Sequence, residues 1–344
     1  MWSVIGQDGA VSFLRHSLSR DRMANGYLFT GPPHIGKMTL ALELAKALNC
    51  LDEDPPCDHC QQCRRIAAAN HADVQIIRLE NSVISGESRE KALISVEQIR
   101  QLQHTASLAP YEGRCRVFII EEAEKLSTSA ANCLLKTLEE PPPDVVFVLL
   151  AQDAGLLPQT VVSRCQHLRL KAIPRCEIVK ALKERGIEPE KVELLARLSH
   201  GHIGWALEVS KDERLLGERQ ERLQRLLGIM AGDLEQRFDY ASSLAANFAE
   251  KRPLVWEELE AWLDIWRDLL LCALGSGEDI INLDIKDWLA DMAATFTLGE
   301  IRGFTEYSCR VRKQLELNAN PRLVLEVMML DMPRIELQEV PSCA

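Results

Sequence analysis

One stretch near the N-terminus limits what this chain can fold into more than any other. It runs from Tyr27 to Thr39 and reads Y-L-F-T-G-P-P-H-I-G-K-M-T. A short apolar run comes first, a Gly/Pro-rich loop follows, and an Ala/Leu-rich segment (40–48) comes last. A strand, a G-x-x-x-x-G-K loop and a helix in this order predict a phosphate-binding P-loop. The glycines let backbone N–H groups turn toward phosphate oxygens, while the helix N-terminus and Lys37 supply positive charge.

The predicted P-loop departs from the pattern of an active one directly after its lysine. A Ser or Thr usually stands there and ligates Mg²⁺ through its hydroxyl, whereas this chain has Met38. Thr39 lies one residue further on, about 100° round the helix, and is a poor substitute. His34 stands where many such loops carry a small residue. Two interpretations stay open: the loop holds a nucleotide, or it only keeps the shape of one that did.

A second apolar run, R-V-F-I-I at 116–120, ends in two acidic residues, Glu121 and Glu122. Open α/β sheets bind ligands at the carboxyl edge of their strands, which is where these acids are expected. The first acid would help to hold Mg²⁺, and the second would orient the attacking water of an ATPase. The predicted nucleotide-contacting residues are Gly31, Pro32, Pro33, Gly36, Lys37, Thr39 and Glu121.

Four cysteines follow the predicted P-loop helix at a metal-binding spacing. Cys50, Cys57, Cys60 and Cys63 form two successive C-x-x-C steps with a fourth cysteine seven residues upstream. Such thiolates can converge on one tetrahedral Zn²⁺, and with all four positions filled the site would be structural. His59 could replace one sulfur, although the two C-x-x-C steps favour the cysteines. The alternative is four ordinary thiols among the eleven cysteines of a chain without a secretion signal.

Composition and charge restrict the class of protein. At 344 residues, two or three domains are expected, and 47% hydrophobic residues are enough for real cores. The net charge of −11 argues against a protein that binds nucleic acid by itself. The N-terminus lacks the basic start and apolar core of a signal peptide, and no run of about 18 apolar residues predicts a membrane span. We therefore expect a cytoplasmic protein that does not contact membranes.

The rest of the first half alternates strand and helix signals. Strands are predicted over 72–79, 145–150 and 168–170, with a polar loop around Gly86 between the first of these and the next helix. That helix begins with a capping box at Ser95. A further helix runs from Ser127 to Glu140 and stops at three prolines. Together with the P-loop, this alternation predicts a parallel α/β sheet.

After Pro174 the pattern becomes helical throughout. Helices are expected over 176–185, 189–199 and 204–211, with long amphipathic segments from about Leu215 to the end. Trp262 and Trp266 are neighbours on one helix face, which usually indicates core packing and not a ligand site.

Taken together, these stretches resemble the bacterial clamp loader of the replicative DNA polymerase III over nearly the whole chain. The most specific matches are the cysteine cluster, the segment S-A-A-N-C-L-L-K-T-L-E-E-P at 129–141, and the triplet S-R-C at 163–165. The resemblance implies an ATPase domain of the AAA+ type followed by helical domains. The implied boundaries are 1–172 for the P-loop domain with its zinc module at 50–63, 173–212 for a helical lid, and 213–344 for a helical collar that joins subunits.

The resemblance also implies a role for Arg164, which composition alone would make an ordinary surface arginine. In the family the Ser-Arg-Cys triplet carries an arginine finger, which acts in trans on the ATP of a neighbouring subunit. The implied partners are gamma/tau and delta subunits in a hetero-pentamer, the sliding clamp, and primed DNA reached through the complex. The implied cofactors are structural Zn²⁺ and ATP or ADP, without a clear Mg²⁺ site.

Two types of subunit in this family fit the chain: one hydrolyses ATP, and the other is a stator that supplies an arginine finger. The departures favour the stator. Met38 removes a Mg²⁺ ligand, Glu121 replaces the usual Asp, and Gly204 stands where the ATP-hydrolysing type carries a nucleotide-contacting arginine. Glu122 would then be vestigial. The alternatives are an active AAA+ ATPase, supported by Lys37 and Glu122, and a zinc-containing DNA-binding protein, which the acidic charge disfavours.

Overall fold

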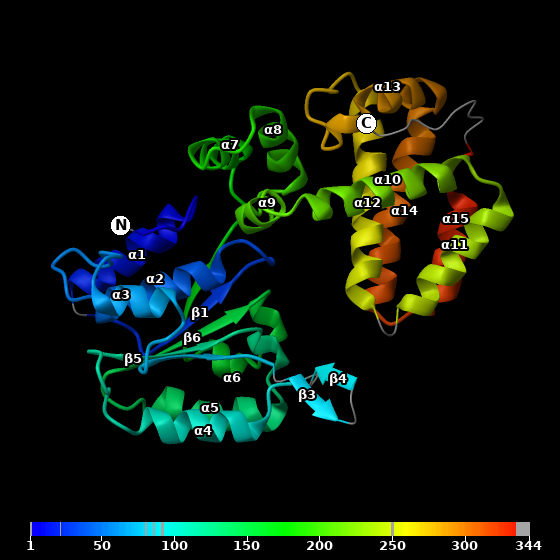
Figure 1. The fold of residues 1–344 in the computed structure, drawn as a ribbon. Helices are drawn as coiled ribbons and strands as arrows, with labels where there is room; N and C mark the ends of the chain where they lie inside the picture. The colour runs from blue at the N-terminus through cyan, green and yellow to red at the C-terminus, as the bar shows by residue number, and fades with distance from the viewer. Residues whose placement is uncertain are drawn as a thin grey trace. The chain divides into compact units, whose positions relative to one another are not determined.

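The computed structural model describes residues 2–20, 22–79, 81–84, 87–90, 93–248 and 251–334. The chain forms two compact units (Figure 1). The first consists of the residues up to Ala181 together with His200–Trp205, and the second of Leu182–Ser199 together with the residues from Ala206 onward. The three-part division at 172 and 212 remains a prediction.

The first unit is built on a five-stranded sheet in which every neighbouring pair of strands is parallel. Its order is β2-β5-β6-β1-β7, so the strand that leads into the P-loop lies between two strands that come much later in the sequence. The strands are β2 (Val74–Ile77), β5 (Arg116–Ile120), β6 (Val145–Ala151), β1 (Gly26–Thr30) and β7 (Gln166–Arg169). β1, β5 and β6 are buried at every residue, as expected of central strands covered on two faces.

Helices cover the two faces of this sheet (Figure 1). On one face lie α1 (Asp8–Ser19), α2 (Lys37–Asn49) and α3 (Gln61–Ala67). On the other lie α4 (Val96–Ala106), α5 (Thr128–Glu139) and the short α6 (Gln159–Val162). Successive strand residues point to opposite faces of the sheet. Phe29 therefore lies in the hydrophobic core on the α2 side, and Leu28 lies in the core on the α5 side. The predicted parallel α/β sheet with a P-loop, followed by helices, is confirmed.

Local signals in the sequence set where the helices begin and end. The predicted capping box at the start of α4 is present, with the Ser95 hydroxyl accepting from the Gln98 N–H and the Gln98 side chain accepting from the Ser95 N–H. Ser127 caps α5 by accepting from the Ala130 N–H. Two short strands, β3 (Asn81–Ile84) and β4 (Glu87–Glu90), pair antiparallel in a segment predicted as polar loop, whereas Gly86 lies outside the described residues. That prediction was wrong for the two strands, because their Ser, Glu and Arg residues give no strand pattern.

The helices that follow the sheet run in chain order through both units. They are α7 (Arg175–Glu184), α8 (Pro189–Leu198), α9 (Ile203–Val209), α10 (Glu213–Ala231), α11 (Leu234–Asn247), α12 (Arg252–Ala273), α13 (Lys286–Thr295), α14 (Leu298–Glu316) and α15 (Pro321–Asp331). Three single turns of 3₁₀ helix lie at Ala123–Lys125, Ala154–Leu156 and Leu283–Ile285. Among the helices of the described residues, none is long and apolar enough to cross a membrane.

The core of the second unit confirms the packing role predicted for its tryptophans. Trp262 and Trp266 on α12 are fully buried in one hydrophobic cluster. Two buried charged residues bind backbone groups of the segments around this cluster. Arg237 donates to four backbone carbonyls, including those of Met230 and Met332 at 2.8 Å each. Asp268 accepts from the backbone N–H groups of residues 281 and 282 at 2.8–3.0 Å. Buried polar groups are tolerated because these bonds satisfy them.

Candidate functional site

The P-loop connects β1 to α2 with the backbone shape that its glycines permit. Gly31 has φ 151° and Gly36 has φ 100°, both in the region that favours glycine. A Cβ at Gly31 would also lie 2.8 Å from the carbonyl oxygen of Leu170, so any side chain there would push the loop off the sheet. Gly36 is the N-cap of α2 and provides no side-chain cap. The first-turn N–H groups of α2 therefore remain available for an anion.

Lys37 lies at the first turn of α2 and folds back over its own loop. Its Nζ donates to the carbonyl oxygens of Gly31 at 2.5 Å and of Pro32 at 2.8 Å. Burial lowers the pKa of Lys37, while the charges of three nearby carboxylates, Glu124 foremost and then Glu121 and Glu122, act in the opposite direction. The structure thus brings the P-loop lysine and the acids after β5 into one electrostatic site.

The three acids after β5 differ in their surroundings. Glu121 forms an ion pair with Arg78, with 2.7 Å between Oε2 and Nε. Glu122 is exposed and has φ 48°. Glu124 was not singled out from the sequence. Its Oε2 is buried and has no hydrogen-bond partner among the described residues. Its position as the third acid of E-E-A-E was the only signal available, and that signal does not say which acid turns inward.

Met38 and Thr39, the two residues after the P-loop lysine, do not restore the lost hydroxyl. Met38 is half-buried and packs against the core on the α2 side of the sheet. Thr39 is exposed. A thioether is a soft ligand that suits Mg²⁺ poorly, since Mg²⁺ prefers oxygen. The position that normally offers a hydroxyl to the metal is therefore occupied by a packing residue.

The segment 200–205 contacts the P-loop from the start of α9. The Gly204 N–H donates to the His34 carbonyl oxygen at 2.8 Å, and a Cβ at Gly204 would lie 2.6 Å from that same oxygen. The pKa of His202, two residues earlier, is lowered by burial and by the charges of His200, His34 and Lys37. Because a side chain at Gly204 would collide with the P-loop backbone, no arginine fits this position in the present arrangement.

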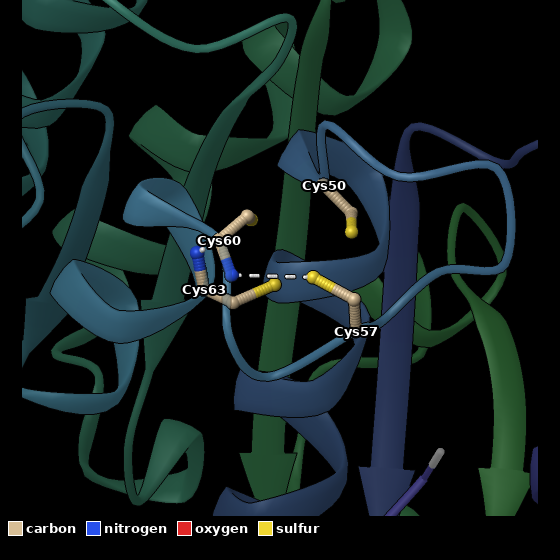
Figure 2. A group of neighbouring side chains, drawn as sticks. All are labelled: Cys50, Cys57, Cys60 and Cys63. Atoms are coloured by element: carbon tan, nitrogen blue, oxygen red, sulfur yellow. Dashed lines mark hydrogen bonds between the residues drawn. The ribbon is translucent and has the colours of Figure 1, made fainter.

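The four predicted metal ligands come together at the end of α2 and the start of α3 (Figure 2). The sulfurs of Cys50, Cys57, Cys60 and Cys63 all lie within 4.8 Å of one another. In a tetrahedral zinc site with bonds of about 2.3 Å, ligand sulfurs are about 3.8 Å apart. The donor set and its spacing therefore fit one Zn²⁺. His59, the alternative ligand, is exposed, and its Nδ1 contacts the Cys57 carbonyl oxygen at 2.8 Å.

Backbone N–H groups support the cysteine cluster. The Cys60 N–H points at the Cys57 sulfur at 3.3 Å, and the Cys63 N–H at the Cys60 sulfur at 3.4 Å. Burial opposes ionisation of Cys60, yet the N–H groups of Leu51 and Cys63 and the neighbouring thiols lower its pKa to about 6. Donors of this kind stabilise thiolates, which are the form that binds metal.

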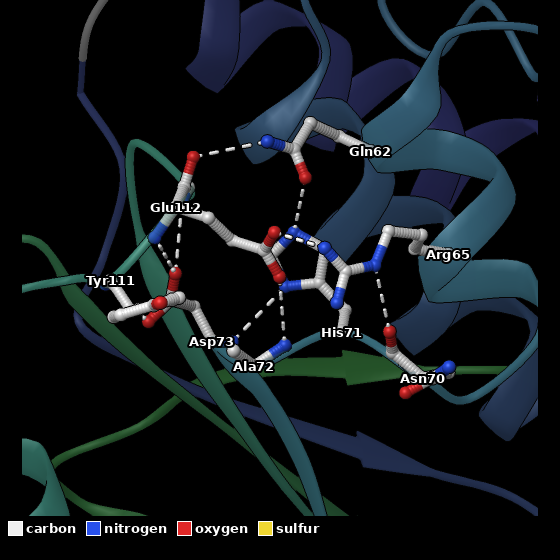
Figure 3. A network of polar contacts seen from close by, with 9 residues as sticks. Gln62, Arg65, Asn70, His71, Ala72, Asp73, Tyr111 and Glu112 are labelled. Carbon is white, nitrogen blue, oxygen red and sulfur yellow. Dashed lines mark hydrogen bonds and ion pairs between the residues drawn. The ribbon is translucent and has the colours of Figure 1, made fainter.

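A polar network ties the cysteine module to the edge of the sheet (Figure 3). Gln62 on α3 contacts His71 Nε2 at 2.6 Å and donates to the Glu112 carbonyl oxygen at 3.0 Å. Arg65 pairs with the Glu112 carboxylate. Asp73 is buried, accepts from the N–H groups of residues 111, 112 and 113 at 2.8 Å each, and lies 3.1 Å from Arg116 Nη2. This network holds the loop before β5 against the end of α3.

Arg164 lies in the connection between α6 and β7. Its Nη1 donates to the Thr160 carbonyl oxygen at 2.9 Å, and its Nη2 lies 2.5 Å from Glu139 Oε1 at the end of α5. The side chain is 35% exposed. The next residue, Cys165, packs against the core beneath the sheet, and burial raises its pKa to about 12. The triplet therefore has an inward anchor and an arginine at the surface.

Comparison with known proteins adds a family to this geometry. Residues 6–174 match the family described as "DNA polymerase III, delta subunit". The DNA polymerase III subunit delta' of Bacillus subtilis is 28% identical over 94% of this chain and 95% of its own length. The subunit tau of Escherichia coli is 31% identical over 95% of this chain and 52% of its own length. The subunit gamma of Buchnera aphidicola is 29% identical over 98% of this chain and 91% of its own length.

These relatives carry three subunit names, and the chain spans about half the length of the Escherichia coli tau subunit. What they share is membership in DNA polymerase III. The parallel P-loop sheet and the cysteine module agree with the resemblance found in the sequence. The chain thus matches the DNA polymerase III delta-subunit family over residues 6–174, and it is similar to DNA polymerase III subunits over nearly its whole length.

Proposed function

We propose that this chain is the delta-prime-type stator of a bacterial clamp loader, which helps to load the sliding clamp on primed DNA during replication. In this role it supplies Arg164 to the ATP site of a neighbouring subunit and hydrolyses little or no ATP itself. Its partners would be gamma/tau and delta subunits in a hetero-pentamer, the sliding clamp, and primed DNA reached through the complex. It would act in the cytoplasm, with residues 1–172, 173–212 and 213–344 as P-loop domain, lid and collar.

The contact between Gly204 and the P-loop carries this proposal. The nucleotide-contacting arginine of the ATP-hydrolysing type would have to extend from Gly204, where even a Cβ lies 2.6 Å from the His34 carbonyl oxygen. Met38 removes a second group, because its thioether cannot replace the Mg²⁺-binding hydroxyl. Phosphoryl transfer needs two things from the protein: a positively charged side chain beside the transferred phosphate and a fixed Mg²⁺. A site without either group supports binding better than turnover.

A nucleotide would still find groups to hold its phosphates. The free N–H groups at the start of α2 and the charge of Lys37 are suited to phosphate oxygens. Lys37 would have to exchange its bonds to the Gly31 and Pro32 carbonyls for bonds to phosphate. We therefore expect ATP or ADP to bind weakly and without a requirement for Mg²⁺.

The four-cysteine cluster would hold one structural Zn²⁺. With all four positions filled by sulfur, the ion would have no open site for a substrate, and its contribution would be to fix the excursion between α2 and α3. Lys46 supports the same excursion, since its Nζ lies 2.7 Å from Asp58 within it and 2.9 Å from Glu43 on α2.

The test of the stator assignment is ATP hydrolysis by the purified chain. We expect no Mg²⁺-dependent hydrolysis above background, together with co-purification of the chain with the other loader subunits and the clamp. The alternative, an ATP-hydrolysing gamma/tau-type subunit or another AAA+ ATPase, draws on Lys37 and on the three carboxylates whose charges raise its pKa. A turnover rate typical of an ATPase in the purified chain would establish that alternative and refute the stator.

A further inference from the structure

Glu139 forms an ion pair with Arg164, the arginine that the proposed function directs at the ATP of a neighbouring subunit. It is the last residue of α5, and its Oε1 lies 2.5 Å from Arg164 Nη2. The other terminal nitrogen, Nη1, donates to the Thr160 carbonyl oxygen at 2.9 Å and to the Ser163 hydroxyl oxygen at 3.3 Å. Both terminal nitrogens of Arg164 are therefore engaged within their own chain.

This pairing competes with contact to a phosphate. A guanidinium stabilises a transferred phosphoryl group best when two of its N–H groups meet two oxygens in parallel. Nη1 is bonded to Thr160 and Nη2 is paired with Glu139, so a two-point contact through these nitrogens requires the ion pair with Glu139 to break. The carboxylate also offsets the positive charge that would act on the phosphate.

The pair is placed where it can exchange partners. The Arg164 and Glu139 side chains are 35% and 48% exposed, so neither charge is trapped in the core. Ion pairs of this exposure are weak, so a phosphate group can outcompete this one. The backbone on each side is fixed, because Leu138 and Val161 are buried in the same core. The ion pair between Arg164 and Glu139 can therefore open without a change of fold.

We propose that Glu139 latches Arg164 in the unengaged subunit and releases it only when a neighbour presents a nucleotide phosphate. This inference rests on the proposed function of Arg164 as an arginine finger. It assigns to Glu139 the regulation of that finger. The carboxylate keeps unstimulated hydrolysis low, and it no longer affects the rate once DNA and clamp have brought Arg164 to the neighbour's phosphate.

The experiment uses the loader reconstituted from all its subunits, with this chain carrying Glu139→Gln. The amide keeps the shape of the side chain but removes the charge, so the latch weakens. We expect hydrolysis without DNA and clamp to rise about two- to five-fold, as loss of an exposed ion pair allows, with the fully stimulated rate unchanged. Glu140→Gln, the same charge change on the adjacent exposed residue, is the matched control and should leave both rates unchanged.

A double variant makes the two proposals separable. If Glu139 acts through Arg164, then Glu139→Gln with Arg164→Ala should behave as Arg164→Ala alone. An unchanged or lower unstimulated rate in Glu139→Gln, or a raised rate that persists in the double variant, would overturn the latch while leaving the finger intact. A full stimulated rate in Arg164→Ala would instead refute the finger on which the latch depends.

Discussion

In the proposed function, the P-loop and the α6–β7 connection of the first unit would each meet a nucleotide phosphate, and they differ in what they retain. The P-loop keeps its backbone shape and Lys37 but has a packing methionine at the metal position and a glycine pressed against its backbone. The connection keeps an anchored Cys165 and a surface Arg164 held by specific bonds. This contrast supports the proposed function, in which the chain acts on another subunit's phosphate and not on its own.

This difference also separates shape from chemistry. The glycines that shape a P-loop are present in a site that lacks a hydroxyl ligand for Mg²⁺. An anion cradle needs only free N–H groups and positive charge, whereas hydrolysis needs fixed metal and a second charge on the transferred phosphate. A P-loop motif alone therefore does not establish an ATPase.

The largest effect is expected for Arg164→Ala. Arginine fingers supplied in trans contribute about 10³–10⁵ in rate at the site they serve. Stimulated hydrolysis by the reconstituted loader should lose the part of the rate that comes from the ATP site facing this chain. Clamp loading should fall with it. Arg164→Lys should rescue poorly, because an ammonium lacks the planar fork that contacts two oxygens.

The control for that prediction is Arg169→Ala, which removes an exposed arginine from the neighbouring strand. It should leave assembly and hydrolysis unchanged. Equal losses in the two variants would mean that the surface charge of this edge matters and not the arginine finger, and the comparison between the two regions would then lose its basis.

Removal of the metal should be the next largest effect. Cys57→Ser combined with Cys60→Ser should reduce zinc from one equivalent to none and lower stability by more than about 2 kcal/mol, as loss of a structural metal does. Metal analysis and thermal unfolding measure this. Cys309→Ser, which changes an exposed cysteine of the second unit, should alter neither. Less than half an equivalent of zinc in freshly purified unmodified protein would contradict the assignment.

Asp73→Asn tests the network that joins the cysteine module to the sheet. Burial alone would raise the pKa of Asp73, but three backbone N–H groups and Arg116 outweigh it and hold that pKa below its usual range. The stabilisation is therefore fully present above the pKa of an unfolded aspartate, about 3.9, and is lost as pH falls through the lower folded value. Near pH 7 we expect a loss of about 2 kcal/mol.

Chemical unfolding at several pH values measures the effect of Asp73→Asn. The gap between the variant and the unmodified chain should narrow below about pH 4, where the Asp73 carboxylate of the unfolded chain begins to take up a proton. Asp144→Asn makes the same charge change at an exposed residue and should show no such pH dependence. A gap that stays constant down to pH 2 would show that the Asp73 charge contributes nothing.

The smallest effect is expected for Met38→Thr. A hydroxyl returns to the metal position, yet the glycine at 204 still leaves no room for an arginine beside the P-loop. Steady-state hydrolysis by the isolated variant should therefore stay at background. Turnover restored by this single change would show that the P-loop lacked only its metal ligand, and the contrast between the two regions would shrink to one residue.

Much of the site could be predicted because its signals are local. The P-loop, the cysteine spacing and the helix caps at Ser95 and Ser127 depend on residues a few positions apart, so the sequence pattern alone identified them. The inward turn of Glu124, the contact of Gly204 with the P-loop, and the pairing of Glu139 with Arg164 join segments far apart in the chain. Such contacts depend on how strands and helices pack, which periodicity does not encode. The hairpin of β3 and β4 escaped prediction because its polar residues lack alternation.

The most direct test of the central claim compares Lys37→Ala with Arg164→Ala in the same reconstituted loader. Hydrolysis stimulated by DNA and clamp is measured for each, with assembly checked by co-purification. The stator account predicts that Arg164→Ala causes the larger loss and that Lys37→Ala changes the rate little, because the chain's own site contributes no turnover. If Lys37→Ala is the more harmful change, this chain is a working ATPase and the stator assignment is wrong.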